Sequence, residues 1–105
     1  MKKVYFNPLA KKDLRDIFIG LLKWKKVELS REEARQYVSD IYNIALSLPY
    51  ETYHQKCKYL IHLKYGNYQY LYQRNKHTMW YIIYNIDIET NSIYIEKIMN
   101  NYLTI

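Results

Sequence analysis

Hydrophobic positions recur with a helical period in the first half of the chain and with a strand period in the second half. Two stretches carry an apolar stripe on one helical face, Pro8 to about Lys25 and Ser30 to about Leu48. The stripe positions are Leu14, Ile17, Phe18 and Leu21 in the first stretch, and Ala34, Tyr37, Val38, Ile41, Ala45 and Leu48 in the second. Because a short polar turn separates them, the two stretches predict a helical hairpin.

Capping residues mark the ends of both expected helices. Asn7 precedes Pro8, so an asparagine N-cap is followed by a proline at the first helical position, where its missing N–H costs nothing. Ser30 and Glu33 form the Ser-x-x-Glu pattern of a capping box. Pro49 is expected to end the second helix, because the residue before a proline disfavours the helical conformation.

Strands are expected at both ends of the chain. Residues 3–6 (KVYF) alternate in polarity, and three later stretches with a period of two are rich in Tyr, Ile and Trp. The later strands cover residues 68–74, 79–86 and 92–99, and the turns between them cover residues 75–77 and 89–91. Such short connections predict an antiparallel meander. We therefore expect an α+β fold: an N-terminal strand, a two-helix hairpin and a three-stranded antiparallel meander that completes a single curved sheet.

The 105 residues are expected to form one domain, 1–105, with a formal net charge of +6. This charge favours acidic or polyanionic partners, although the Lys-, Asn-, Ile- and Tyr-rich composition of AT-rich genomes offers a second explanation. Residues 52–86 contain no Asp or Glu, but they hold all three histidines and many of the fourteen tyrosines. The basic residues of this acid-free segment are Lys56, Lys58, Lys64, Arg74 and Lys76. Clustered charge of this kind indicates a site.

Other classes of protein are disfavoured by what the sequence lacks. Cys57 is the single cysteine, so no internal disulfide is possible, which is typical of a reducing compartment. Residues 1–7 are too short and polar to begin a signal peptide, and no apolar run approaches the length of a membrane span. No zinc-ligand spacing, phosphate-binding glycine loop or helix-turn-helix pattern is present. We expect a cytoplasmic protein without membrane contact, metal or cofactor.

Several stretches match a known family. The N-terminal VYFNPLAKKDLRDI contains Pro-x-Ala-x-x-Asp-Leu at the helix start, the Ala-rich second helix ends in SLP, and the last strands read MWYIIYNID and IYIEKIMNNY. From the first strand to Tyr102, the chain resembles the RelE/ParE toxin superfamily of type II toxin–antitoxin systems, which includes plasmid stabilisation proteins. The resemblance implies a bacterial toxin that is silenced by a cognate acidic antitoxin. It also implies either mRNA cleavage on the ribosome or inhibition of DNA gyrase.

Residues for metal-independent RNA cleavage are available in the acid-free segment. Cleavage needs a base for the 2′-hydroxyl, a cationic clamp on the phosphate and an acid for the leaving oxygen. The candidate catalytic residues are Lys58 and Lys64 as base or electrostatic partner, Arg74 as clamp, and His77 or Tyr102 as acid, the role of Tyr102 being implied by the resemblance. Candidates for RNA binding are Lys56, Lys76 and Tyr81, and many relatives carry arginine at the position of Tyr81. We expect the site on the concave face of the sheet.

Plainer explanations exist for each candidate. Residues 74–77 also fit an ordinary polar hairpin turn, and Lys56 and Lys58 fit solvated loop charges. His54, His62, Trp80, Tyr81 and Tyr84 are expected to pack in the core or on a sheet face. Without catalysis, the same surface would suit the acidic tail of an antitoxin. The alternatives to an endoribonuclease are therefore a non-enzymatic gyrase inhibitor and a decayed toxin-fold protein that only binds an acidic partner.

Overall fold

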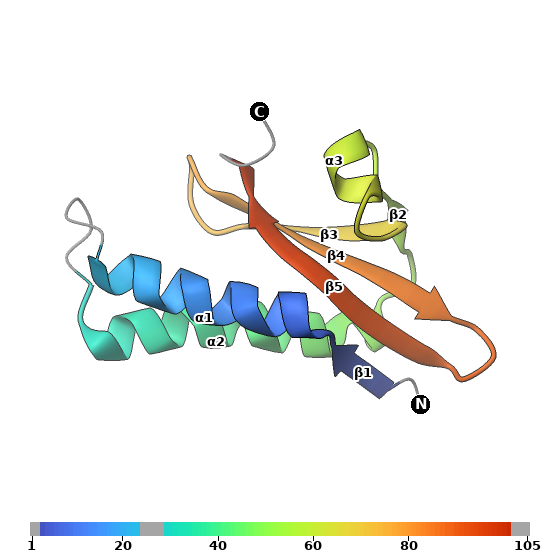
Figure 1. Cartoon of the computed structure of the whole chain (residues 1–105), viewed down its shortest axis with the longest axis horizontal. Helices are drawn as coiled ribbons and strands as arrows, with labels where there is room; N and C mark the ends of the chain where they lie inside the picture. The colour runs from blue at the N-terminus through green and yellow to red at the C-terminus, as the bar shows by residue number, and fades with distance from the viewer. Residues whose placement is uncertain (1–2, 24–28, 102–105) are drawn as a thin grey trace.

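The computed structural model describes residues 3–23 and 29–101 (Figure 1). Its elements are β1 (Lys3–Phe6), α1 (Pro8–Lys23), α2 (Arg31–Ser47), the 3-10 turn η1 (Leu48–Tyr50), β2 (Gln55–Lys56), α3 (Leu60–Leu63), β3 (Tyr68–Gln73), β4 (Met79–Asp87) and β5 (Ser92–Asn100). The α+β class, the helical hairpin and the late meander expected from the sequence are confirmed. Lys25, the expected end of the first helix, lies outside the described residues.

The sheet contains five strands in the order β1-β5-β4-β3-β2. β1 runs parallel to β5, and all other neighbours are antiparallel. The expectation of four strands was wrong, because the segment between Pro49 and Tyr68, expected to be irregular, contains β2 and the one-turn helix α3. Two paired residues and a single helical turn are too short to leave a readable hydrophobic period in the sequence.

The helix ends are formed as expected. Asn7 Oδ1 accepts a hydrogen bond from the Ala10 amide at 2.9 Å. Ser30 Oγ accepts one from the Glu33 amide at 3.1 Å, and Glu33 Oε1 accepts one from the Ser30 amide at 3.2 Å, which completes the capping box. α2 ends at Ser47 and continues into the 3-10 turn that contains Pro49. No helix in the described ranges has the length and apolarity needed to cross a bilayer.

The two faces of the sheet have different coverings. In Figure 1, α1 and α2 lie side by side against one face, which we call the helix face, and α3 lies on the other, which we call the open face. Side chains alternate along β4, so Trp80, Ile82 and Tyr84 pack against the helices whereas Tyr81 and Ile83 belong to the open face. The main core therefore lies on the helix face. It contains Trp80 and Tyr84, which the sequence predicted to pack in the core or on a sheet face.

A β-bulge in β5 interrupts the alternation of side chains between the two faces of the sheet. Ile83 pairs with Lys97 but Tyr84 pairs with Ile95, so Glu96 is the extra residue. Ile95 before the bulge and Ile98 after it both pack in the core of the helix face. Because β1 ends where Phe6 pairs with Ile95, the rest of β5 has no strand neighbour on that side among the described residues.

Asp13 of α1 caps this unpaired part of β5. Its carboxylate accepts a hydrogen bond from the Ile98 amide at 2.9 Å and pairs with Lys97 Nζ at 2.7 Å. The side chain of Asp13 is nearly buried, so both contacts compensate for its lost hydration. The Asp of the Pro-x-Ala-x-x-Asp-Leu pattern thus joins the first helix to the last strand.

Candidate functional site

The open face of the sheet is covered in part by α3. A small cluster of Cys57, Tyr81, Ile83 and Met99 is buried there, with Tyr65, Leu71 and Met79 packed against it. α3 contacts this cluster through His62, whose ring centroid lies 4.5 Å from that of Tyr81. Tyr65, just after α3, lies against the same cluster. The acid-free segment therefore builds most of the open face.

Three lysines gather around Tyr65 and α3. Lys58 precedes α3, Lys64 is its C-cap, and both are exposed. Lys64 Nζ lies 5.4 Å from the centroid of the Tyr65 ring, and Lys97 Nζ lies 5.5 Å from it. Lys97 is also paired with Asp13, so Lys58 and Lys64 supply the charge that is exposed to solvent. The open face beside α3 is thus electropositive.

Lys56 is placed elsewhere. In the register of β2 and β3, Lys56 lies opposite Tyr68, which packs against the core of the helix face. Directly opposed residues in an antiparallel pair project from the same face of the sheet. Lys56 therefore lies at the sheet edge, on the side away from α3, although it belongs to the same acid-free segment.

Arg74 also belongs to the helix-face side of the molecule. Its guanidinium Nη1 donates to the Asp40 carboxylate of α2 and to the Tyr72 hydroxyl, and its Cζ lies 4.2 Å from the centroid of the Tyr37 ring. The hydrogen bond from Arg74, with a second from Gln36, lowers the pKa of Asp40. The charge of Arg74 is therefore engaged in joining β3 to α2.

The turn between β3 and β4 has the geometry of an ordinary polar hairpin turn. Asn75 Oδ1 accepts hydrogen bonds from the His77 amide at 2.9 Å and from the Thr78 amide at 3.0 Å. Asn101 Nδ2 donates to the His77 carbonyl at 3.1 Å. Lys76 and His77 are exposed on this turn.

The candidate residues therefore fall into separate groups. In Figure 1, α3 and the β3–β4 turn lie toward opposite ends of the sheet. Lys58 and Lys64 are exposed at either side of α3, and Tyr81 is buried beneath it. Arg74, Lys76 and His77 lie at the other end of the sheet, between β3 and β4. Tyr102 lies outside the described residues.

Buried polar groups lie beneath α3. His62 is completely buried, and neither of its ring nitrogens makes a hydrogen bond of normal geometry within the described ranges. The Oε1 atom of Gln69, on the adjacent β3, is likewise unpaired there. Burial lowers the pKa of His62, and the neighbouring Gln69 side chain opposes this only in part. Burial also raises the pKa of the Tyr81 hydroxyl. The expected packing role of His62 is confirmed, but its missing partners could not be foreseen, since α3 leaves no sequence signal.

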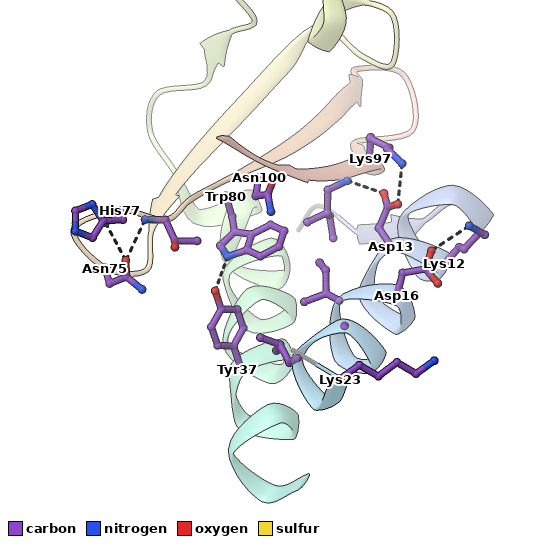
Figure 2. A pocket seen from close by; sticks show the side chains of 15 residues that line it. Lys12, Asp13, Asp16, Lys23, Tyr37, Asn75, His77, Trp80, Lys97 and Asn100 are labelled. Atoms are coloured by element: carbon purple, nitrogen blue, oxygen red, sulfur yellow. Dashed lines mark hydrogen bonds and ion pairs between the residues drawn. The ribbon is translucent and has the colours of Figure 1, made fainter. Parts of the chain in front are cut away.

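A cavity of about 880 Å³ lies on the other side of the molecule, between α1, the β3–β4 turn and the unpaired part of β5 (Figure 2). Its apolar lining includes Ile17, Leu21, Tyr37, Trp80 and Ile98. Trp80 Nε1 donates to the Tyr37 hydroxyl at 2.9 Å. Sequence reasoning missed this cavity because it depends on how the helices diverge from the sheet.

The charges of this cavity are largely compensated. Figure 2 shows Lys97 against Asp13 and Lys12 against Asp16, the latter pair at 3.0 Å. Lys23 adds one lysine of the lining beyond these two ion pairs, whereas the open face offers Lys58 and Lys64 with no carboxylate in their segment, so the open face suits a polyanion better. Of the described residues proposed for catalysis, His77 is the one that lines it.

Within the described ranges, no group of three or more His, Cys, Asp or Glu side chains is arranged to hold a metal ion. The sequence matches no protein-family model and no curated protein. Function is therefore argued from the open face.

Proposed function

We propose that this chain is a RelE/ParE-type toxin that inhibits translation by acting on mRNA at the ribosome, and that it meets the RNA with its open face. The observation that carries the proposal is the electropositive surface beside α3, built from a segment without a single carboxylate. The family resemblance of the N-terminal motif and of the last strands supports the toxin assignment. An α+β arrangement with two helices on one sheet face is compatible with it.

The chemistry of the open face suits single-stranded RNA. Lys58 and Lys64 are exposed and can contact phosphates, which contribute affinity without sequence preference. Tyr59 is half exposed beside them and offers a ring on which a base can stack. Arg74 lies on the helix-face side, where it is engaged with Asp40, so Lys58 and Lys64 are the exposed cations that the open face beside α3 offers to an RNA backbone.

A growth and translation assay tests the proposal. We expect induction of the wild-type chain without an antitoxin to arrest growth and to block translation in a ribosome-containing extract. The double variant Lys58→Ala/Lys64→Ala should lose most of both effects. The matched control Lys11→Ala/Arg31→Ala removes two exposed charges from the helices and should behave as wild type. Full arrest by the Lys58/Lys64 variant would contradict the proposal.

A non-enzymatic inhibitor of DNA gyrase is the second candidate. The observation that favours it is the separation of the catalytic candidates, since Lys58 and Lys64 lie by α3 and His77 lies at the β3–β4 turn. A binding protein needs no converging acid and base. On this hypothesis, induction would alter plasmid supercoiling while bulk mRNA stays intact, and measuring both after induction separates the two candidates. A chain that only binds an acidic partner would be harmless in the same experiment.

A further inference from the structure

The cavity between α1, the β3–β4 turn and the unpaired part of β5 has no part in the proposed function. Its volume of about 880 Å³ lies within the range of roughly 300–1,000 Å³ that is typical of small-molecule pockets. Ile17 and Leu21 of α1 line it, together with Tyr37 and Trp80, which we call the aromatic pair. The rings of the aromatic pair meet edge to face, with their centroids 6.2 Å apart. An occupant that removes this concave apolar surface from water is therefore favoured.

A glycine inside α1 faces this cavity although the fold does not require it. Gly20 is one of the lining residues, and its φ is not in the left-handed region. Beyond its own helix and chain neighbours, a Cβ added at Gly20 would meet no atom of the described residues within 4 Å. Glycine in a helix interior lowers stability relative to alanine. Neither a turn nor close packing accounts for Gly20, whereas a side chain at this position would narrow the cavity.

The charged groups of the lining are largely compensated within the chain. Lys97 Nζ pairs with Asp13 at 2.7 Å, and Lys12 Nζ pairs with Asp16 at 3.0 Å. In Figure 2, the ammonium end of Lys23 points away from the aromatic pair. An ionic ligand would lose its hydration on entering the apolar part of the cavity, where the charges it meets already have partners. The charges therefore favour a neutral ligand.

Neutral hydrogen-bonding groups lie at one side of the cavity. Asn75 and Thr78 of the β3–β4 turn line it, as does Asn100 at the end of β5. Amide and hydroxyl groups of this kind can bind a hydroxyl or carbonyl group of a ligand without any net charge. The indole N–H of Trp80 already donates to the Tyr37 hydroxyl at 2.9 Å, so the aromatic pair offers ring surface to an occupant.

We propose that this cavity is a binding site for a neutral, planar aromatic small molecule that carries one hydroxyl or carbonyl group. The ring of the ligand packs between the apolar side chains of α1 and the aromatic pair, and its polar group faces the β3–β4 turn. Because the lining comes from both helices and from the sheet, the ligand stabilises the folded chain by mass action. The inference does not rest on the proposed function, which uses the open face on the other side of the sheet.

The test compares three probes that share a naphthalene ring and differ in charge. They are naphthol, which is neutral, naphthoate, which is anionic, and naphthylmethylammonium, which is cationic. Calorimetry and the chemical shift of the Trp80 indole N–H measure their binding to the full chain. We expect naphthol to bind about tenfold or more tightly than either ion and to raise the midpoint of thermal unfolding. Absence of naphthol binding would overturn the proposal, and so would tighter binding of either ion.

A substitution at Gly20 tests where the probe binds. Gly20→Leu places a side chain where the fold leaves space, so it should weaken naphthol binding by about tenfold or more. Its unfolding midpoint should be no lower than that of wild type, because leucine favours a helix over glycine. The matched control Arg15→Leu introduces the same side chain at an exposed residue of α1 outside the lining, and it should bind as wild type. Naphthol binding that is unaffected by Gly20→Leu would overturn the proposal.

Two other occupants give different outcomes. The last residues of the chain include Leu103 and Ile105, and Leu103→Ser/Ile105→Ser should leave the affinity for naphthol unchanged. A higher affinity in this variant would show that the chain's own end competes for the cavity, and it would overturn the proposal. Size-exclusion chromatography tests the second occupant. A dimeric wild type together with a monomeric Gly20→Leu chain would assign the cavity to a second copy and would also overturn the proposal.

Discussion

The helix face and the open face are built from alternate residues of the same strands. They differ in whether their polar side chains have hydrogen-bond partners. On the helix face, Trp80 donates to Tyr37, and Arg74 pairs with Asp40. On the open face, His62 and Gln69 are buried with unpaired atoms while Leu60 is exposed. In a stably folded chain, buried polar groups normally form hydrogen bonds and aliphatic side chains are normally buried. The open face departs from both, and such departures are expected at functional sites.

The largest expected effect comes from the core of the helix face. Ile82→Ala removes a fully buried side chain between the sheet and the helices, and it should lower the free energy of unfolding by about 2–5 kcal/mol. Denaturant unfolding of the purified chain measures it. An effect no larger than that of a surface substitution would show that the helix face is not the main core.

The ion pair between Arg74 and Asp40 should give the next largest effect. Arg74→Ala removes the charged donor of the partly buried Asp40 carboxylate and leaves it the hydrogen bond from Gln36, so we expect a loss of about 1–2 kcal/mol in the free energy of unfolding. Lys12→Ala breaks the exposed pair with Asp16 and serves as the control, with an expected change of less than about 0.5 kcal/mol. Equal effects of the two variants would contradict a structural role for Arg74.

The Asp40 carboxyl also gives this pair a pH dependence. Because its pKa is lowered from 3.8 in the folded chain, the stabilisation is fully present above pH 3.8 and is lost as the pH falls through the lowered folded value. Asp40→Asn should remove this part of the acid sensitivity. Unfolding midpoints measured across the acid range in wild type and variant check it.

Much of the helix face could be predicted from the sequence, because its signals are local. The stripes of the two helices, the Asn7 and Ser30 caps and the alternation in the last three strands all act within a few residues. The parallel pairing of residues 3–6 with residues 92–95 could not be predicted, since nothing local specifies a partner so distant in the chain. The same limit applies to Asp13, whose contact with Ile98 joins residues 85 positions apart in the chain.

The candidate site was harder to predict because charge in a sequence does not show where a side chain points. Arg74 was expected to clamp phosphate, but Asp40, 34 residues earlier, lies against it in the folded chain. Lys56 and Lys58 are neighbours in the sequence, yet the strand register places Lys56 on the side away from α3. The acid-free segment contains most of the residues of the open face, whereas α3 and the buried His62 had no readable pattern.

His62→Leu should act in the opposite direction to the core variants. The substitution removes a buried imidazole without normal hydrogen bonds and fills its site with an apolar side chain, so we expect a gain of about 1 kcal/mol in the free energy of unfolding. Since the pKa of His62 is lowered from 6.5, wild-type stability should fall as the pH drops below 6.5, where the unfolded chain takes up the proton more readily than the folded chain.

Unfolding of His62→Leu between neutral and mildly acidic pH tests both statements. The variant should lose this part of the pH dependence, and His77→Gln, on the exposed turn, should keep it. A His62→Leu chain that is less stable than wild type at neutral pH would mean that the imidazole has a partner that compensates its burial.

The smallest effect on stability is expected for Leu60→Ser. This variant tests most directly how the open face differs from the helix face. Leu60→Ser changes a leucine that is 86% exposed, so the free energy of unfolding should stay within about 0.5 kcal/mol of wild type. Denaturant unfolding of the purified variant and of wild type measures this difference. An unchanged free energy of unfolding would separate α3 on the open face from the packed core of the helix face, whereas a large loss of stability would show that α3 is part of the core.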